Sequence, residues 1–287
     1  MRAIPGDIVV LGAGGKMGPT LAIRAKRAVP EKRVIAVSRF SSATAGKVLR
    51  DAEVETVSAD LFDRSAKLPD AENVIYMAGR KFGSAGAESL TWAMNAYLPA
   101  MVCERYKQSR IVAFSSGNIY PVLPVTSGGA TEKTPVGPTG EYAQSVLARE
   151  RIFEYFSSEH GLPVLLIRLN YAVDLRYGVL LDIGTKVFQR EPVEVAMGAV
   201  NVIWQGDANS VSLRSLQLCA SPAALLNLTG PETLSVRQIA LRFGEHFGVT
   251  PAFTGTEGTN ALLNYAARCF GLFVYPSVTV EQIIEWT

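Results

Sequence analysis

A glycine-rich segment near the N-terminus has the residue types and spacing that bind a phosphate group. It reads Gly12-Ala13-Gly14-Gly15-Lys16-Met17-Gly18 and lies between an apolar run and an amphipathic run. Glycines at positions 12, 15 and 18 let the backbone turn tightly, approach a pyrophosphate and pack a helix against a strand. The N–H groups at the start of that helix then face the phosphates. The segment therefore predicts a dinucleotide site. The alternative is that its glycines only allow a tight turn and bind no ligand.

Ser38 and Arg39, which end the second apolar run, indicate which dinucleotide binds. An acidic side chain at this place accepts hydrogen bonds from the ribose hydroxyls of NAD. The sequence has no carboxylate here and offers a guanidinium, which suits the 2′-phosphate of NADP. We therefore expect NADP, with NAD as the alternative in which Arg39 is only a solvated surface residue.

Alternating apolar and amphipathic runs over the first 170 residues must position these groups. The predicted strands are 7–12, 33–38, 54–58, 73–77, 110–115 and 163–168. The predicted helices are 16–28, 43–51, 84–106 and 141–159. Because parallel strands need a helical crossover, the pattern predicts an α/β fold with a doubly wound parallel Rossmann sheet. Ligands of such sheets bind at the carboxyl ends of the strands.

The pattern after residue 168 is less regular, and Gly and Pro residues separate its helical runs. Helices are predicted over 178–190, 208–220, 236–247 and 259–270. We expect residues 1–170 to form the dinucleotide-binding domain, with 199–228 returning to it. Residues 171–198 and 229–287 are expected to form a small, interleaved α/β cap that binds the substrate.

Composition and charge exclude several other function classes. The 287 residues include 28 Lys and Arg, 26 Asp and Glu, 2 His and 3 Cys, with a net charge of +2. The chain has no long basic run for nucleic acid, no apolar stretch of about 18 residues to span a membrane, and no recognisable signal peptide. The isolated cysteines and histidines predict no metal site and no disulfide framework. We expect a cytoplasmic protein with a small-molecule substrate.

Several motifs, in order along most of the chain, resemble those of the extended short-chain dehydrogenases. Besides the glycine segment they are Ala59-Asp60-Leu61, Phe114-Ser115-Ser116-Gly117-Asn118-Ile119-Tyr120, the run with Glu132, Pro135, Pro138 and Tyr142, and Asn227-Leu228-Thr229-Gly230-Pro231-Glu232. More narrowly, the chain resembles the NAD-dependent epimerase/dehydratase family. The resemblance implies a Rossmann fold and NAD(P)-dependent reduction, epimerisation or dehydration of a sugar-like or carbonyl substrate.

The resemblance also implies roles for individual residues at the cofactor. Asp60, followed by Leu61, matches a carboxylate that accepts a hydrogen bond from the adenine amino group. Ala78 and Gly79 match backbone that passes close to the cofactor, and Asn95 matches an asparagine that supports the active site. The predicted cofactor site consists of these residues, the glycine segment, Ser38, Arg39, Ser115 and Tyr142.

Two side chains are implied to carry the reaction. Ser116 matches the serine that hydrogen-bonds the substrate oxygen, and Tyr142 matches the general acid/base. The residues expected to contact the substrate are Arg80, Lys81, Ser116, Gly117, Asn118, Asn170 and Tyr171. Without the resemblance, Ser115 and Ser116 could cap a strand end, and Tyr142 could be a half-buried packing residue.

Three positions depart from the family pattern. In the family a lysine follows the tyrosine by one helical turn, where it binds the nicotinamide ribose and makes the phenol a better base. Val146 occupies that position here, and an ordinary phenol is a poor base at pH 7. Tyr171 stands where the family has an asparagine, and Val200 where epimerases have an arginine for the substrate diphosphate. A smaller sugar, a sugar acid or a carbonyl compound is therefore at least as consistent with the sequence as a nucleotide-diphosphate sugar.

The missing lysine leaves two functions open. The first is an NADP-dependent reductase, epimerase or dehydratase, in which another cation substitutes for the lysine. The candidates by sequence context are Arg80, Lys81, Lys133 and Arg149. Arg80 and Lys81 could equally be a solvated loop pair, and Arg149 could equally be a surface charge. The second function is a non-catalytic NADP(H)-binding sensor or regulatory protein.

The two long helices predicted at 84–106 and 141–159 resemble a pair that many family members use for a two-fold contact. Tyr97, Met101, Val146 and Phe153 have spacings that could form such a face. Most apolar stripes of this kind pack against the sheet of their own chain. A homodimer is therefore one hypothesis, and a place in the chain's own core is the other.

Overall fold

The structure is a computed structural model that describes residues 1–41, 43–81 and 85–287. A seven-stranded sheet runs in the order β12-β7-β5-β4-β1-β2-β3. Its strands are β1 (Ile8–Leu11), β2 (Val34–Ser38), β3 (Glu55–Ser58), β4 (Asn73–Tyr76), β5 (Arg110–Ser116), β7 (Val164–Leu169) and β12 (Ala224–Leu228). β1 pairs in parallel with β2 and β4, β2 with β3, and β4 with β5. The predicted doubly wound fold is confirmed, and β12 is a strand that the sequence pattern did not identify.

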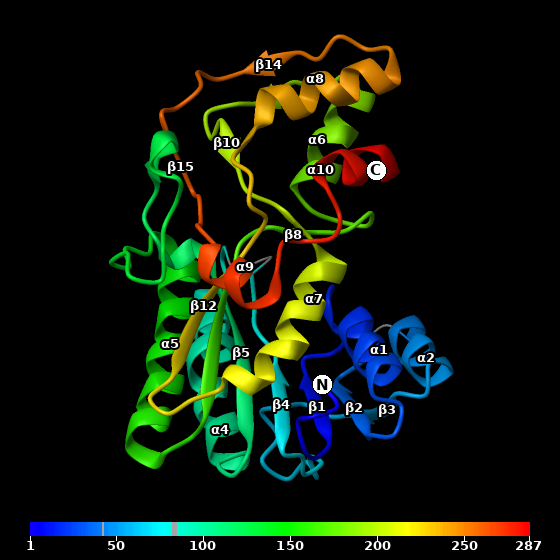
Figure 1. Ribbon diagram of the computed structural model, residues 1–287, viewed down its shortest axis with the longest axis vertical. Helices are drawn as coiled ribbons and strands as arrows, with labels where there is room; N and C mark the ends of the chain where they lie inside the picture. Colours follow the sequence, from blue (N-terminus) through cyan, green and yellow to red (C-terminus); the bar gives the residue numbers. More distant parts are fainter. Residues whose placement is uncertain (42, 82–84) are drawn as a thin grey trace. The chain divides into compact units, whose positions relative to one another are not determined.

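Helices that follow these strands pack on the sheet, as crossovers between parallel strands require. α1 (Gly18–Ala28) contacts β2, α2 (Ala43–Asp51) contacts β3, and α5 (Gly140–His160) contacts both β5 and α4 (Leu98–Arg105). Figure 1 shows α1 and α2 in blue beside β2 and β3. Over residues 1–41, 43–81 and 85–287, we find no helix with the length and apolar character needed to cross a membrane.

The long helix predicted over 84–106 is divided. Its first predicted residue lies outside the described part of the chain, residues 85–87 are not helical, and the helix begins only at α3 (Glu88–Trp92), followed by a π-helical turn (Ala93–Tyr97) and then α4. Pro99 has no N–H to donate to the carbonyl four residues earlier, which favours such a break in the hydrogen-bond ladder. The π turn changes which side chains face the sheet, so a regular helical periodicity places them wrongly.

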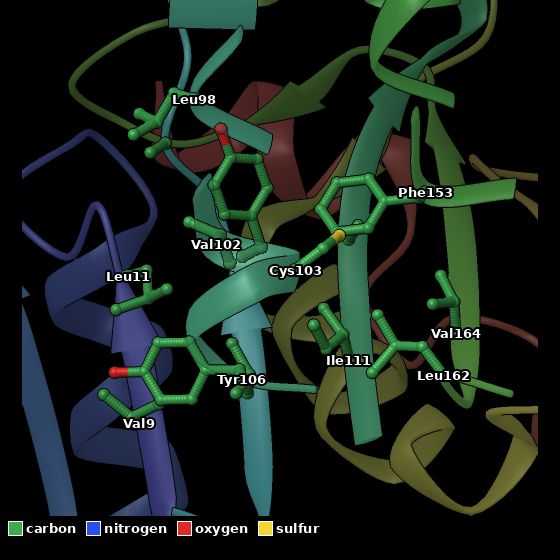
Figure 2. Packing of buried hydrophobic residues seen from close by; sticks show 14 of the residues in the cluster. Val9, Leu11, Leu98, Val102, Cys103, Tyr106, Ile111, Phe153, Leu162 and Val164 are labelled. Carbon is green, nitrogen blue, oxygen red and sulfur yellow. The ribbon is translucent and has the colours of Figure 1, made fainter. Parts of the chain in front are cut away.

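Apolar side chains from the sheet and from α4 and α5 form one core. Val9 and Leu11 of β1, Cys103 of α4 and Phe153 of α5 are all completely buried. Figure 2 shows these side chains in one cluster. Fully burying a side chain of this size stabilises the fold by about 1.5–3 kcal/mol. The apolar runs that predicted the strands are therefore the same residues that hold the sheet together.

The apolar stripe on the two long helices divides between core and surface. Val146 and Phe153 are 1% and 0% exposed within this chain. Tyr97 is 52% exposed, and its ring stacks on Phe62. The core hypothesis holds for the first two residues, and the homodimer stays a hypothesis.

The chain forms two compact units that interleave along the sequence. Unit 1 comprises Met1–Ser116, Pro138–Ile167 and Asn209–Leu225, and unit 2 comprises Gly117–Gly137, Arg168–Ala208 and Leu226–Thr287. The sequence pattern had assigned residues 117–137 to the dinucleotide-binding domain, whereas the structure groups them with unit 2. That unit 2 binds the substrate stays a prediction. α7 (Gln205–Arg214) and the short 3₁₀ helix Ser215–Leu218 carry the chain from unit 2 into unit 1.

Unit 2 is built from four helices and pairs of two-residue strands. The helices are α6 (Val179–Phe188), α8 (Val236–Phe247), α9 (Ala267–Phe273) and α10 (Val280–Trp286). The strand pairs are β8 (Ala172–Val173) with β11 (Ile203–Trp204), β9 (Val193–Glu194) with β14 (Phe253–Thr254), β10 (Ala199–Val200) with β13 (Leu234–Ser235), and β6 (Leu123–Pro124) with β15 (Asn260–Ala261). α6 and α8 contact each other and enclose a second apolar core.

The helix predicted over 259–270 is wrong in its first half. Residues 260–261 form β15, and a helix begins only at Ala267. The run from Ala261 to Asn264 is buried throughout. A short apolar run that is buried on all sides has no periodicity that separates a helix from an extended segment.

Candidate functional site

The glycine turn between β1 and α1 has two positions that admit only glycine. Gly12 has φ +84°, and a Cβ there would lie 2.6 Å from the backbone nitrogen of Ala78. A Cβ on Gly18 would lie 2.4 Å from the carbonyl oxygen of Ala13. A Cβ on Gly15 would lie 3.4 Å from the nearest oxygen, so the protein's own packing does not require glycine there. The first two glycines therefore shape the turn, and the third leaves space beside it.

A cavity of about 260 Å³ opens beside this turn. Residues that follow β1, β2, β3 and β4 line it, because parallel strands end at one edge of the sheet. The lining residues are Gly12, Gly14, Gly15, Ser38, Arg39, Phe40, Ser41, Ala45, Ala59, Asp60, Leu61, Phe62, Met77, Ala78, Gly79, Met94 and Leu98. We call this the β1–β4 cavity. It brings together nine of the residues predicted to bind the cofactor, whereas Lys16, Met17 and Gly18 lie at the start of α1.

An apolar wall of the β1–β4 cavity was missed by sequence reasoning. Phe40 and Phe62 follow β2 and β3, and Met94 and Leu98 come from the π turn and α4. Phe40 has φ 44°, which is rare for a residue other than glycine and concentrates at functional sites. The two helical residues could not be placed because the π turn was not expected. Together these side chains offer a surface for a flat, apolar group.

Two opposite charges share the mouth of the cavity. Arg39 Nη1 lies 3.9 Å from Asp60 Oδ2, and their side chains are 72% and 47% exposed. Asp60 Oδ1 also accepts a hydrogen bond of 3.0 Å from the backbone N–H of Phe62. A long, exposed ion pair contributes about 0–1 kcal/mol, so it does not fix the guanidinium in place. Arg39 can therefore turn towards a ligand anion, while Asp60 is held by its own loop.

Arg149 is the centre of a buried polar network between β5 and α5. It is 6% exposed and donates hydrogen bonds to the Phe114 carbonyl, at 2.7 Å, and to Asn95 Oδ1, at 2.6 Å. Its guanidinium also lies 5.6 Å from the centre of the Tyr76 ring. The hypothesis that Arg149 is a surface charge is therefore wrong. A Cβ on Gly79 would lie 2.2 Å from Arg149 Nη2, so the guanidinium itself requires glycine at that position.

Asn95 ties this network to the loop after β4. Its Oδ1 also accepts from the backbone N–H of Arg80, at 2.9 Å. Its Nδ2 donates to the Arg80 carbonyl, at 3.0 Å, and to Ser145 Oγ, at 2.9 Å. The amide is fully buried and both of its ends are engaged by protein groups. The structure therefore shows Asn95 holding the backbone after β4, and its supporting role at the active site stays a prediction.

The ends of β5 and α5 carry the two residues implied to do the chemistry. Ser115 Oγ donates a 2.5 Å hydrogen bond to the fully buried Glu150, so this serine belongs to the packing of α5 on β5. We call the contacts of Asn95, Ser115, Ser145, Arg149 and Glu150 the β5–α5 seam. Ser116 is the last residue of β5 and is 7% exposed. Tyr142 lies in the first turn of α5 and is half-buried. The seam thus anchors the strand and the helix that bear the predicted Ser and Tyr.

Lys81, directly after the loop that Asn95 holds, lies against Tyr142. Its Nζ is 5.8 Å from the centre of the Tyr142 ring. Partial desolvation, and then the nearby charge of Lys16, lower the pKa of the Lys81 ammonium. The structure therefore brings a lysine of the glycine segment, a lysine of the β4 loop and the predicted acid/base into one neighbourhood of unit 1.

Two of the four remaining predicted substrate contacts, Gly117 and Asn170, lie at a buried side-chain amide in unit 2. A Cβ on Gly117 would lie 2.8 Å from both ends of the Asn264 amide and 3.1 Å from Asn170 Cβ. Asn170 Nδ2 donates weakly to the Leu262 carbonyl, at 3.4 Å, and Asn118 follows Gly117 in a 3₁₀ turn. Asn264 is 2% exposed, and neither end of its amide has a hydrogen-bond partner in the described chain. Such a group costs about 1–3 kcal/mol, which points to a functional position.

The sequence offered no signal for Asn264, because its segment was predicted to be helical. Tyr171, the fourth substrate candidate in unit 2, has φ 42°, and burial raises the pKa of its phenol. Val200, at the position where epimerases have an arginine, is 4% exposed in the core of unit 2. It therefore supplies no charge for a diphosphate.

Comparison with known proteins identifies the family. A model of the "NAD dependent epimerase/dehydratase family" matches residues 8–173, more than half of the chain. The chain belongs to this family. No curated protein matches the sequence of this family member. The resemblance carried by the glycine segment, Asp60 and the Ser115–Tyr120 run is thereby confirmed at the level of the family.

Solved structures of sugar-nucleotide enzymes share the fold of this family member. A UDP-glucuronic acid 4-epimerase from Bacillus cereus, in complex with UDP-glucuronic acid and NAD, is 16% identical with a TM-score of 0.81, over 97% of this chain and 96% of that chain. A UDP-glucose 4-epimerase from Thermotoga maritima, with UDP-glucose, is 17% identical with a TM-score of 0.79, over 98% and 97%. A dTDP-glucose 4,6-dehydratase from Bacillus anthracis, in complex with NAD, is 15% identical with a TM-score of 0.81, over 98% and 96%. At these identities the likeness shows the fold alone.

Proposed function

We propose that this family member is an NADP-dependent enzyme that reduces, epimerises or dehydrates a small sugar, a sugar acid or another carbonyl compound. The observation that carries the proposal is the β1–β4 cavity. There the glycine turn, the Ser38-Arg39 pair and Asp60 meet at one edge of a parallel sheet. This combination supplies a place for a pyrophosphate, a sugar phosphate and a base within one enclosure.

Each part of a dinucleotide has a matching surface. The pyrophosphate fits beside Gly14 and Gly15, at the N-terminal end of α1, where backbone N–H groups and the helix dipole favour an anion. The adenine fits against the apolar wall formed by Phe40 and Phe62, with the Asp60 carboxylate at its edge. The NAD complexes among the solved structures support a nicotinamide dinucleotide in this fold.

The choice of NADP rests on Arg39. Its guanidinium is 72% exposed and only loosely paired, so it can form charge-assisted hydrogen bonds with a 2′-phosphate. Isothermal titration with NADPH and NADH tests this choice. We expect NADPH to bind at least about tenfold more tightly than NADH, and Arg39→Ala to remove most of that difference, because such bonds contribute about 1.5–3 kcal/mol. Arg242→Ala, an exposed arginine of α8, is the control. Equal binding of both dinucleotides by the wild type would leave NAD as the coenzyme.

The chemistry is assigned to Ser116 and Tyr142. A bound reduced dinucleotide supplies a hydride to the carbonyl carbon. Ser116 Oγ hydrogen-bonds the carbonyl oxygen, and the Tyr142 phenol donates its proton to that oxygen as the bond to carbon forms. In this direction Tyr142 gives up a proton and does not have to act as a base, so the absence of a lysine at position 146 affects reduction less than oxidation.

Turnover tests this assignment. Purified protein should oxidise NADPH in the presence of at least one member of a panel of aldoses, ketoses, sugar acids and UDP-sugars. Tyr142→Phe should lower kcat by about 100-fold or more while NADPH binding stays unchanged, since removal of a general acid typically has an effect of this size. If the variant turned over at the wild-type rate, another group would have to be the proton donor.

One observation favours a second candidate, a non-catalytic sensor of NADP(H). Val146, one turn after Tyr142, is 1% exposed and brings no charge to the helix face where the resemblance expects a lysine. The sensor hypothesis predicts NADPH binding without turnover over the whole panel. Turnover of any member that depends on Tyr142 would exclude it.

A further inference from the structure

Tyr142 has a cation beside it that does not come from its own helix. Lys81 belongs to the loop after β4, and its Nζ lies 5.8 Å from the centre of the phenol ring. The backbone of Arg80, the residue before Lys81, is held in place because its N–H and its carbonyl are both bonded to the buried Asn95 amide. The lysine is therefore presented to the tyrosine by a fixed backbone.

Of the two positions on α5 that share a helix face with Tyr142, one holds a cation bound to other groups and the other holds an apolar side chain. The Arg149 guanidinium is buried between the Phe114 carbonyl and Asn95 Oδ1, two helical turns from Tyr142. The helix position one turn from Tyr142 holds buried Val146. Glu141, the carboxylate that precedes Tyr142 in the sequence, accepts a hydrogen bond from Trp92 Nε1 at 2.5 Å. The contact with Lys81 thus brings an ammonium group from another element of unit 1 to the Tyr142 ring.

We propose that Lys81 is the positioning residue that supplies the positive charge beside the Tyr142 phenol. The ammonium favours the phenolate that remains after the proton has left, and it orients the ring towards the loop. The proposal deepens the proposed function, on which it rests for the role of Tyr142. It does not require the lysine to touch the substrate.

Lys16 gives this arrangement a dependence on the coenzyme. Its charge opposes that of Lys81 and is one of the two causes of the lowered Lys81 pKa. Phosphates bound at the start of α1 offset the charge of Lys16, so the Lys81 ammonium is retained to higher pH. The cation beside Tyr142 is therefore most fully charged when the dinucleotide is in place.

The ionisation of Tyr142 tests the proposal without any substrate. The tyrosinate absorbance of each protein is followed against pH, and subtracting the curve of the matching Tyr142→Phe variant isolates this residue. Lys81→Met should move the midpoint up by about 0.5 pH unit, the effect in a water-like dielectric of removing a unit charge that lies 5.8 Å from the ring centre. Lys81→Arg should restore the wild-type midpoint. Lys107→Met, at an exposed lysine after α4, is the matched control and should change nothing.

An unchanged midpoint in Lys81→Met would overturn the proposal. If the NADPH dissociation constant of that variant also rose tenfold or more, Lys81 would be a phosphate ligand and not the cation beside Tyr142. A midpoint shift in a protein that binds no pyridine nucleotide would refute the proposed function and leave the inference about Lys81 standing.

Discussion

The β1–β4 cavity and the β5–α5 seam belong to the same unit but are held in different ways. The cavity is shaped by backbone at Gly12 and Gly18, and its charged side chains, Arg39 and Asp60, are exposed and loosely paired. The seam is built from fully or nearly fully buried side chains, with hydrogen bonds of 2.5–2.9 Å between them. The cavity can therefore change its ligand preference with little effect on folding, whereas the seam cannot lose a member without destabilising the unit.

The largest effect is expected in the seam. Arg149→Met should lower the free energy of unfolding by about 3 kcal/mol, because it removes two buried, charge-assisted hydrogen bonds, to the Phe114 carbonyl and to Asn95 Oδ1, and leaves Asn95 Oδ1 with only the bond from the Arg80 N–H. Urea unfolding measures the loss. Arg151→Ala, at an exposed ion pair on the same helix, should change stability by less than about 1 kcal/mol. Similar losses in both variants would remove the contrast between seam and surface.

Gly12→Ala and Gly15→Ala separate two roles within the cavity. Gly12→Ala should destabilise the protein by about 2 kcal/mol, since φ +84° disfavours a side chain and the Cβ would meet Ala78. Gly15→Ala should leave thermal stability nearly unchanged and weaken NADPH binding about tenfold, because its Cβ fits the protein but occupies the space given to the pyrophosphate. A Gly15→Ala protein with full NADPH affinity would contradict the placement of the phosphates.

A gain in the free energy of unfolding, and not a loss, is expected from a substitution of Asn264 in unit 2. Asn264→Leu should raise the free energy of unfolding by about 1 kcal/mol, because a buried amide without partners is replaced by an apolar group of similar size. If the amide serves a substrate, the same variant should lose activity. Asn227→Leu, at a buried asparagine whose Nδ2 donates to the Ala130 carbonyl, should instead be destabilising. A loss of stability in both variants would show that Asn264 is a structural residue.

The smallest stability effect is expected at Arg39. Arg39→Ala should change the free energy of unfolding by less than about 0.5 kcal/mol, because the side chain is 72% exposed and its ion pair is long. The same variant should show the loss of NADPH affinity described above. A clear destabilisation would place Arg39 with the seam residues and not with the ligand-facing ones.

The sequence located the strands and the glycine turn well because both depend on local properties. β1, β2 and β4 are apolar runs buried on both faces, and each was predicted to within one residue at each end. α2 and α8 coincide with their predicted ranges. The seam was not predicted, because Asn95, Phe114 and Arg149 are 19 to 54 residues apart and only the packing of α5 on the sheet brings them together. The run before α9 was misassigned for a similar reason, since its burial comes from neighbours distant in the chain.

The sequence by itself determined the doubly wound sheet, the glycine turn and the residues at the carboxyl ends of the strands. The structure of alternating apolar runs, and of turns that require glycine, depends mainly on residues that are close together in the sequence. Only the tertiary structure decided that Arg149 is buried, that Lys81 lies against Tyr142, and that the Asn264 side-chain amide has no hydrogen-bond partner among the residues that the structure describes. These facts depend on desolvation and on the exact neighbours of a polar group, and the fold supplies those neighbours from distant parts of the chain.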